Sequence, residues 1–363
     1  MDKEKKIAVL FSGGVDSVVV TKMMQEQGFL CELFFMKTDF FSENIVKKAE
    51  ESAKILGLKI NIIDLSKEFQ QNVIEYFKKE YQNNRTPNPC VMCNKTMKFG
   101  LLFDKVRKLG FDKIITGHYV KNFKFQISSQ VMRRDKNFKK NDKQRTEYQL
   151  EVAEDRKKDQ SYFLWNLTQE QLGYLEFPVG GMQKSEVIKI AKELGIPFAD
   201  EESQDICFLD GDHNKFLQEH LNLKQGEIKN KQGEVLGEHF GLPLYTIGQR
   251  RWIKIGGTGP YYVLRKDIFE NTLYVTNSFD DPDLYADEFT ISDVNWISGN
   301  APKAENLSVK LRYLHPAVDI KSIENKENGE YNIVLKEKQR AITAGQSGVV
   351  YGGCTLLGGG IIK

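Results

Sequence analysis

The sequence has 363 residues, which at roughly 100–200 residues per domain is enough for two or three domains, and its formal net charge is +2 at pH 7. This balance excludes a polycation that binds nucleic acid over its whole surface, so such binding would need local basic patches. The five cysteines are an odd number in a long chain, which argues against a secreted disulfide framework. The apolar stretch before residue 12 is too short for a signal peptide, and no later window reaches the length of a membrane span. We therefore expect a soluble, cytoplasmic protein with no membrane contact.

The most informative motif follows the first predicted strand, at residues 7–11. It reads Ser12-Gly13-Gly14-Val15-Asp16-Ser17 and opens an apolar helix at residues 18–27. The two glycines permit a tight turn that brings backbone N–H groups against a polyanion, and the positive end of the helix dipole points at the same place. The Lys of the ordinary P-loop is missing. The motif instead resembles the PP-loop of the ATP pyrophosphatases, which cleave ATP between the α- and β-phosphates; a glycine-rich turn without a ligand is the alternative.

Apolar strands alternate with amphipathic helices from residue 7 to about residue 207. Further strands are expected at 31–36, 59–64 and 113–116, and helices at 43–56, 69–81 and 184–194. Such alternation predicts an α/β domain with a parallel sheet that is covered on both faces. Ligands of such sheets bind beyond the carboxyl ends of the strands, which is where the Ser12–Ser17 motif lies.

A second motif, Thr86-Pro87-Asn88-Pro89-Cys90-Val91-Met92-Cys93-Asn94-Lys95, presents two thiols at C-x-x-C spacing in front of a predicted helix. We expect Lys95 and the start of the helix to lie near Cys93 and to lower the pKa of its thiol. A third thiol, Cys207, stands at the end of the α/β region and reaches the other two only through the fold. Half of a zinc site, or chance, is the alternative for the C-x-x-C pair. Buried packing roles are expected for the two remaining cysteines, Cys31 and Cys354.

Turns and short strands replace the helices after residue 211. Glycine-rich segments at 230–233 and 256–260 interrupt a middle region, and an acidic, proline-containing segment at 280–283 resembles a linker. Beyond it, alternating apolar residues predict short strands at 289–297, 307–314, 318–323, 331–335 and 348–357, which is typical of a small barrel. We therefore expect a nucleotide-binding α/β domain at 1–211, a small β-rich domain at 212–283 and a C-terminal β-barrel at 284–363.

Further segments stand in the same order as in one known family. They are Phe35-Met36-Lys37, Thr116-Gly117-His118-Tyr119, Lys158-Asp159-Gln160-Ser161-Tyr162-Phe163-Leu164, Phe177-Pro178-Val179-Gly180, Ile206-Cys207-Phe208, Tyr245-Thr246-Ile247-Gly248-Gln249-Arg250-Arg251, Gly345-Gln346-Ser347 and Gly358-Gly359-Gly360-Ile361-Ile362. Together with the two motifs above, they cover nearly the whole chain. The sequence resembles the bacterial tRNA-specific 2-thiouridylases of the PP-loop superfamily, which sulfurate C2 of the wobble uridine of tRNA.

The resemblance implies roles for individual residues. ATP would be held by Phe11, Ser12, Gly13, Gly14, Val15, Asp16 and Ser17, with Met36 and Gly117 beside the adenosine. The tRNA would be contacted by Asn88, Pro89, Cys90, His118, Lys158, Asp159, Gln160, Arg312, Tyr313 and Gln346. Cys93 and Cys207 would be the two sulfur-handling thiols, and the C-terminal barrel would hold the anticodon stem-loop.

The implied reaction is consistent with these parts. The C2 oxygen of uridine is a poor leaving group, so ATP adenylates it and AMP departs when sulfur attacks C2. Asp16 with Mg²⁺ would neutralise the charge that builds on pyrophosphate. Cys207 would carry a persulfide received from a sulfur donor or carrier protein. Its terminal sulfur either attacks C2 directly or is released by Cys93 as hydrosulfide, which closes a Cys93–Cys207 disulfide.

The chain departs from the family pattern at two places. Many members have Asp where this chain has Cys90, so a candidate general base is missing, and Cys90, Cys93 and Cys207 become candidate ligands of a 4Fe–4S cluster. The chain is also longer between Tyr119 and Lys158, where Lys and Arg are abundant from residue 121 to 145. That run is either a solvated loop or an additional contact with the tRNA backbone.

Two other functions are weighed against this one. The first is another PP-loop enzyme, such as an amidating synthetase or a tRNA thiolase that uses an iron–sulfur cluster; the second is a tRNA-binding protein with a relic PP-loop. The joint presence of the Thr86–Lys95 and Tyr245–Arg251 motifs disfavours the former. The intact Ser12, Asp16, Ser17, Cys93 and Cys207 disfavour the latter.

Overall fold

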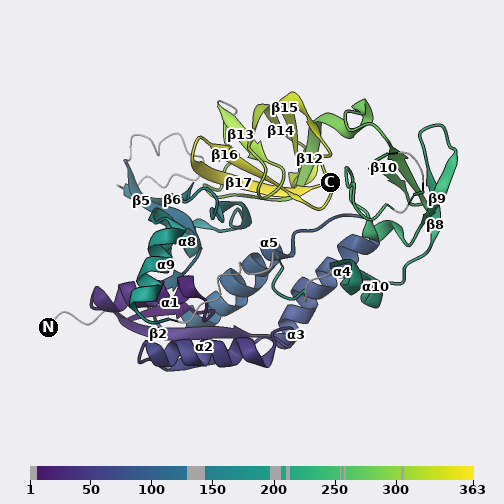
Figure 1. The fold of residues 1–363 in the computed structure, drawn as a ribbon. Helices are drawn as coiled ribbons and strands as arrows, with labels where there is room; N and C mark the ends of the chain where they lie inside the picture. Colours follow the sequence, from purple (N-terminus) through teal and green to yellow (C-terminus); the bar gives the residue numbers. More distant parts are fainter. Residues whose placement is uncertain are drawn as a thin grey trace.

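The computed structural model describes residues 6–128, 144–196, 206–209, 213–253, 255–256, 259–303 and 306–363. Figure 1 shows an α/β region that contains α1, α2 and α9, a barrel on the opposite side of the molecule, and a small sheet with β8, β9 and β10 beside the barrel. Among the described residues, no helix combines the length and the apolar character that crossing a membrane requires.

The first sheet consists of five parallel strands in the order β3–β2–β1–β4–β7. The strands are β1 (Lys6–Leu10), β2 (Leu30–Lys37), β3 (Ile60–Asp64), β4 (Lys113–Thr116) and β7 (Leu175–Glu176). The chain proceeds from β1 to β2 on one side, whereas β4 pairs with β1 on the other side. The carboxyl end of β1 is therefore the point where the strand order reverses, and ligands of open parallel sheets bind at such a point.

Both faces of this sheet are covered by the apolar sides of helices. Ile7 and Val9 of β1 pack in one cluster with buried residues of α1 (Val15–Glu26), α2 (Glu43–Ile55) and α9 (Lys184–Glu193). Ala8 and Leu10 face the other way and pack with the helical segments at 66–82 and 89–107. Successive residues of a strand point to opposite faces, so this division follows directly from the apolar run in β1. The predicted parallel sheet is confirmed.

The two helical segments on the second face each contain a π-helical stretch. The first comprises α3 (Ser66–Phe69), a π-helix at Gln70–Ile74 and α4 (Glu75–Gln82). The second comprises α5 (Pro89–Cys93), a π-helix at Asn94–Leu102 and α6 (Phe103–Arg107). Pro89 suits the first position of a helix because its missing N–H has no partner there in any case. The second segment therefore begins in the C-x-x-C motif, and π-helical stretches are frequent at functional sites.

An antiparallel hairpin links the α/β region to the barrel. It consists of β5 (Val120–Ser128) and β6 (Gln144–Val152), and β6 also pairs with β17 through Leu150 and Glu151. The expectation of a loop at residues 121–145 is therefore wrong for both ends of that run, where alternating apolar and polar residues form strands. Residues 129–143, with Arg133, Arg134, Lys136, Lys139, Lys140 and Lys143, lie outside the described residues. Short helices follow at Ser161–Phe163, α8 (Gln169–Tyr174) and Pro178–Gly181.

The middle region contains α10 (His213–His220) and a four-stranded sheet in the order β10–β11–β8–β9. Its strands are β8 (Gly226–Lys229), β9 (Val235–His239), β10 (Tyr262–Asp267) and β11 (Thr272–Thr276), with short 3₁₀ helices at Leu242–Leu244 and Pro282–Leu284. This region is β-rich and small, as predicted.

The C-terminal region is an antiparallel barrel that the pairing of β12 with β17 closes. Its strands are β12 (Tyr285–Trp296), β13 (Leu307–Lys310), β14 (Val318–Asn325), β15 (Tyr331–Arg340), β16 (Ser347–Gly352) and β17 (Thr355–Ile362), with a 3₁₀ turn at Glu327–Gly329. Alternate residues of these strands, such as Phe289 and Ile291, fill the barrel. The predicted fold class is confirmed: a PP-loop α/β region, a β-rich middle region and a C-terminal barrel.

Candidate functional site

The turn between β1 and α1 forms a backbone cradle that α2 closes from one side. Gly13 has a φ of +74°, and a Cβ atom there would lie 2.5 Å from Cα of Ala49, so that only glycine is accommodated. Ser52 Oγ of α2 donates a hydrogen bond of 3.1 Å to the Gly13 carbonyl. Ser17 Oγ donates to the Gly14 carbonyl at 2.8 Å. The first N–H groups of α1 have no partners within the helix, and this geometry suits the binding of an anion.

A lysine from a distant part of the chain stands at the cradle. Lys184, the first residue of α9, forms an ion pair with Oδ1 of Asp16, and Tyr119 donates a hydrogen bond of 2.8 Å from its hydroxyl to the same oxygen. The Lys184 ammonium also lies 5.6 Å from the centre of the Tyr119 ring. The positive charge that the motif lacks locally is therefore supplied through the tertiary structure. Nothing in the sequence around Lys184 singled it out.

The predicted adenosine neighbours lie at the carboxyl ends of the central strands. Gly117 follows β4, and a Cβ atom there would lie 3.1 Å from Cβ of Asp16. Phe11 and Met36 are buried at the ends of β1 and β2. The structure thus brings these three residues and the Ser12–Ser17 motif to one edge of the sheet.

His118 directly follows Gly117 in the chain. Its Nδ1 is 2.7 Å from Oγ1 of Thr116, and its ring contacts Phe99 with a centroid distance of 5.4 Å. Desolvation lowers the pKa of His118 well below its usual value, and the positive charge of Lys98 lowers it further. The ring is therefore neutral at pH 7, so that it offers hydrogen bonds and not a positive charge to a ligand.

The two thiols of the C-x-x-C motif lie in different environments. Cys90 stands in the first turn of α5, which Asn88 caps by accepting a hydrogen bond of 3.4 Å from the Val91 N–H. Cys93 lies one turn further along and is buried. Burial raises the pKa of the Cys93 thiol to about 12, against a smaller decrease caused by Lys98. The expected decrease of this pKa is therefore wrong, because Cys93 lies one turn inside the helix and is almost wholly buried.

The third thiol, Cys207, is exposed, although desolvation still raises the pKa of its sulfur. The charge of Lys98 lowers the pKa of Cys93, of Cys207 and of His118. One cation therefore acts on both sulfur atoms and on His118, and the contact of Phe99 with His118 joins the helical segment of Cys93 to the residue next to Gly117. Within the described ranges, no three Cys, His, Asp or Glu side chains are grouped as a metal site.

An aromatic cluster anchors the segment that carries Cys207. Phe208 is buried and makes edge-on contacts with Phe69, Phe77 and Phe216, with centroid distances of 5.9, 5.5 and 5.9 Å. Phe40 completes the cluster at 6.1 Å from Phe208. Aromatic pairs stabilise a fold by more than the burial of their apolar area accounts for. Phe208 therefore fixes its neighbour Cys207 against α3 and α4.

The remaining cysteines differ from each other. Cys31 is buried in β2 as expected, and burial raises its pKa to about 11. Cys354 is exposed, so the expectation of a packing role is wrong for this residue; it lies in the turn between β16 and β17. Its sulfur accepts a hydrogen bond of 3.4 Å from the Arg156 guanidinium.

The loop that leads to the C-x-x-C motif is held by the other two regions of the molecule. Thr86 N–H donates to the Ala344 carbonyl at 2.9 Å, and its carbonyl accepts from Nε2 of Gln346 at 2.8 Å. Its hydroxyl is 2.9 Å from the hydroxyl of Thr246 in the middle region. Gln346, an expected tRNA contact, is thus bound to this loop.

Two other expected tRNA contacts are turned inward. Asp159 is buried, and its carboxylate accepts hydrogen bonds from the Ala153 N–H at 3.0 Å and from the Ser161 hydroxyl at 2.8 Å. Gln160 accepts a hydrogen bond of 3.0 Å from the Tyr119 N–H. Asp159 therefore fixes the chain between β6 and the short helix at Ser161–Phe163, whereas Gln160 holds Tyr119. Lys158, beside them, is partly exposed.

Arg312 and Tyr313 lie at the face of the barrel that meets the α/β region. Arg312 donates hydrogen bonds of 2.9 Å to the Ala341 carbonyl and 2.8 Å to the Thr343 hydroxyl, and desolvation lowers its pKa. The Tyr313 ring contacts Phe163 with a centroid distance of 4.4 Å. Phe163 in turn accepts a hydrogen bond at its carbonyl from Asn94, next to Cys93.

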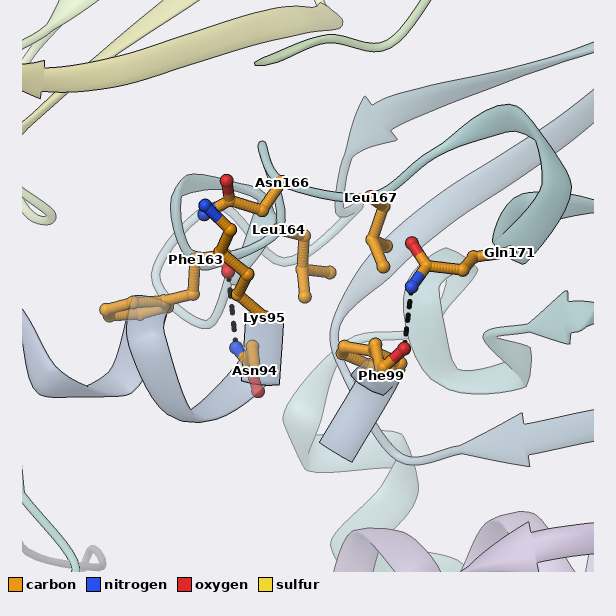
Figure 2. Close-up of a pocket in the computed structure, with 8 residues that line it drawn as sticks. All are labelled: Asn94, Lys95, Phe99, Phe163, Leu164, Asn166, Leu167 and Gln171. Carbon is orange, nitrogen blue, oxygen red and sulfur yellow. Dashed lines mark hydrogen bonds between the residues drawn. The ribbon is translucent and has the colours of Figure 1, made fainter. Parts of the chain in front are cut away.

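Figure 2 shows the small pocket that this contact borders. It is lined by Asn94, Lys95 and Phe99 of the π-helical stretch and by Phe163, Leu164, Asn166, Leu167 and Gln171. Nε2 of Gln171 donates a hydrogen bond of 2.6 Å to the Phe99 carbonyl. The pocket walls therefore tie the thiol-bearing helix to the segment at 163–171. Lys95, which was expected beside Cys93, is exposed at this pocket instead.

The residues that sequence reasoning missed are Tyr119, Lys184, Lys98, Phe208 and Thr246. Tyr119, Phe208 and Thr246 stand inside motifs named above, but no local pattern indicates what they contact. Lys98 stands five residues after Cys93, within a π-helical stretch that is not readable from the sequence.

Three family models match the chain. The description "tRNA methyl transferase HUP domain" applies to residues 5–211, "tRNA methyl transferase PRC-barrel domain" to residues 214–277 and "Aminomethyltransferase beta-barrel domain" to residues 286–362. The three matched ranges correspond to the α/β, middle and barrel regions of the structure.

Curated relatives match over nearly the full length. The tRNA-specific 2-thiouridylase MnmA of Idiomarina loihiensis is 37% identical over 99% of this chain and 96% of the relative. The tRNA-specific 2-thiouridylase MnmA 2 of Geobacillus kaustophilus is 38% identical over 99% of this chain and 95% of the relative. Among solved structures, a 4-thiouridine synthetase in complex with RNA and ATP aligns at 20% identity over 59% of this chain and 49% of that chain, with a TM-score of 0.35, a likeness too weak to carry an argument.

Proposed function

The chain belongs to the tRNA-specific 2-thiouridylase family, and from this premise we propose that it replaces the C2 oxygen of the wobble uridine of tRNA with sulfur in an ATP-dependent reaction. Its enzyme class is therefore tRNA-uridine 2-sulfurtransferase. The observation that carries the proposal is that Gly117 packs against Asp16 of the cradle, while the adjacent His118 contacts Phe99 of the helical segment that begins in the C-x-x-C motif. We place the reaction in the cytoplasm.

ATP is assigned to the cradle at Phe11–Ser17, with Met36 and Gly117 beside the adenosine. The open N–H groups of α1 suit the phosphates, and Lys184 supplies a cation next to them. Asp16 is the candidate ligand of Mg²⁺: both of its protein contacts fall on Oδ1, and Mg²⁺ commonly uses one or two carboxylates together with substrate phosphates. Bound Mg²⁺ supplies charge neutralisation for departing pyrophosphate.

Sulfur transfer is assigned to Cys207 and Cys93. A donor protein or carrier transfers a persulfide sulfur to Cys207, and its terminal sulfur attacks C2 of the adenylated uridine, displacing AMP. Sγ of Cys93 then attacks Sγ of Cys207, which breaks the S–S bond and leaves a Cys93–Cys207 disulfide; the Cys93 thiol proton passes to the departing 2-thiouridine. If Cys93 attacks first, hydrosulfide is released and becomes the nucleophile at C2. Either order requires a thiol reductant before the next cycle.

The 4Fe–4S alternative concerns Cys90, Cys93 and Cys207. The described residues do not group three such ligands as placed, so no step is assigned to a cluster. Cys90→Asp separates the two chemistries: the persulfide mechanism predicts retained thiolation, whereas a cluster mechanism predicts loss of bound iron, of visible absorption and of activity together. The measurement is made on protein prepared without oxygen.

The three domains are expected at residues 1–211, 212–283 and 284–363, and the tRNA is assigned to the surface that they share. Asn88, Pro89 and Cys90 face the target base in this proposal. The neighbouring tRNA contacts are made by a further set of residues, either directly or by holding the loops that touch the tRNA. They are His118, Lys158, Asp159, Gln160, Arg312, Tyr313 and Gln346. The uridine must leave its stack to reach a covered nucleotide site.

The test is mass analysis of the wobble nucleoside after incubation of the protein with ATP, tRNA and a persulfide donor, together with pyrophosphate release. The expected product has sulfur in place of oxygen, and a methylated product would support the activity that the domain descriptions name. Asp16→Ala should abolish pyrophosphate release. Cys207→Ser should retain part of that release and lose thiolation, as should Cys93→Ser, while Cys31→Ser and Cys354→Ser serve as controls. Thiolation by Asp16→Ala at the parental rate would contradict the assigned ATP site.

A further inference from the structure

The turn at residues 245–252 of the middle region is a rigid element that carries exposed side chains. Gly248 N–H donates to the Val263 carbonyl at 2.8 Å, and Val263 N–H donates to the Gln249 carbonyl at 3.0 Å. The Gln249 side chain accepts from the Thr246 N–H at 2.9 Å and donates to the Arg251 carbonyl at 2.8 Å. Four hydrogen bonds therefore fix the backbone from Thr246 to Arg251.

Three consecutive side chains project from this turn. Arg250 and Arg251 are exposed, and neither guanidinium has a hydrogen bond or an ion pair to any residue that the structure describes. Trp252 is 58% exposed and has a φ of +70°, a left-handed conformation that is disfavoured for a bulky side chain. This exposed indole on a strained backbone, beside two guanidinium groups that pair with none of the described residues, makes no visible contribution to the packing of those residues, and such strain clusters at functional positions.

The turn lies where the three regions of the molecule meet. The Thr246 hydroxyl is 2.9 Å from the hydroxyl of Thr86, which begins the loop leading to Cys90. A Cβ atom on Gly248 would lie 2.6 Å from Cβ of Ala341 in the barrel, so the turn also packs closely against the barrel. Arg250, Arg251 and Trp252 are therefore held at a fixed position relative to the loop that the proposed function assigns to the target base.

We propose that Arg250, Arg251 and Trp252 form a contact with the tRNA, in which the guanidinium groups bind backbone phosphates and the indole stacks on an unpaired base near the target uridine. This inference rests on the proposed function. Two unpaired cations next to a flat exposed ring match a single-stranded polyanion whose bases have free faces. No acidic residue stands between 241 and 259 to oppose an RNA backbone.

The experiment measures tRNA affinity as a function of salt concentration. Arg250→Gln with Arg251→Gln should reduce the slope of log affinity against log salt by about 1.4 to 1.8, since each phosphate contact contributes about 0.7 to 0.9. The matched control is Lys47→Gln with Lys48→Gln, which removes two exposed charges from α2, far from the barrel in Figure 1. This control should leave the slope close to the parental value.

The indole is tested separately from backbone strain. Trp252→Ala should weaken tRNA binding about tenfold, as loss of one stacked base does, and Trp252→Phe should restore most of it. Trp252→Gly removes the left-handed strain and should raise the melting temperature, yet it should bind tRNA as weakly as the alanine variant. Phe269→Ala, which removes a fully exposed ring from the β10–β11 turn, is the control and should bind like the parent.

Unchanged tRNA affinity and salt slope in the double arginine variant and in Trp252→Gly would overturn the inference. If these variants instead lose sulfur uptake from the donor protein while tRNA binding persists, the surface serves that protein and the inference fails as well. A parent protein that binds no tRNA would contradict the proposed function itself, and the two failures are thereby distinguishable.

Discussion

Replacing Gly13 with alanine tests whether the cradle depends on the close approach of α2. The φ of Gly13 is +74°, which costs an L-residue about 1–2 kcal/mol. The added methyl would lie 2.5 Å from Cα and 2.8 Å from Cβ of Ala49, closer than carbon atoms approach, so α2 must shift. Overpacking of this kind costs about 1–3 kcal/mol. We expect Gly13→Ala to lower the free energy of unfolding by about 2–5 kcal/mol and to abolish ATP binding.

Gly14→Ala is the matched control at the neighbouring position. Gly14 has a φ of −76°, and a Cβ atom there would meet only the Ser12 hydroxyl, at 3.3 Å. That side chain can rotate, so we expect a loss below about 1 kcal/mol. The double variant Gly13→Ala with Ala49→Gly removes the contact at 2.8 Å but keeps the one at 2.5 Å, and should recover only part of the loss.

Urea unfolding and calorimetric titration with ATP measure both effects. The reasoning would be refuted if Gly13→Ala and Gly14→Ala were equally stable and bound ATP equally well. Full recovery in the double variant would show that the clash involves the Ala49 side chain and not the backbone of α2.

Three further predictions concern side chains to which the sequence assigned no role. Lys184→Met should weaken ATP binding at least about tenfold in calorimetry, because Asp16 then faces the phosphates without its cation; parental affinity would contradict this role. Phe208→Ala should lower thiolation more than pyrophosphate release and speed alkylation of Cys207, because the aromatic cluster no longer holds that segment; an unchanged alkylation rate would contradict the anchor. Desolvation lowers the pKa of Lys266 from 10.5 to about 8. Between pH 8 and 10 the unfolded chain therefore binds more protons than the folded chain, and the free energy of unfolding should rise with pH. Urea unfolding across this range should show the rise, about 1–3 kcal/mol, in the parent and not in Lys266→Met.

The sequence by itself determined the fold class and the location of the cradle. An apolar strand, two glycines and an apolar helix form a turn whose conformation depends on residues within a few positions of one another, and the apolar run in β1 already required cover on both faces. Alternating apolar residues in the C-terminal region predicted the barrel. The motifs also located Cys93 and Cys207 in the chain, although they could not show which groups surround them.

The tertiary structure decided the properties that depend on packing between distant segments. Burial raises the pKa of Cys93, whereas its position before Lys95 predicted a decrease, because desolvation depends on what the whole fold packs around a sulfur atom. Lys184 reaches Asp16 from a helix that lies 168 positions away, and Thr86 is held by residues 160 and 260 positions away. Exposure of Cys354 and strand formation at the ends of the 121–145 run likewise depend on pairing with β16, β17 and β6. Hydrophobic periodicity and turn chemistry act locally and are readable from the sequence, whereas charge partners and desolvation are set by neighbours that only the folded chain brings together.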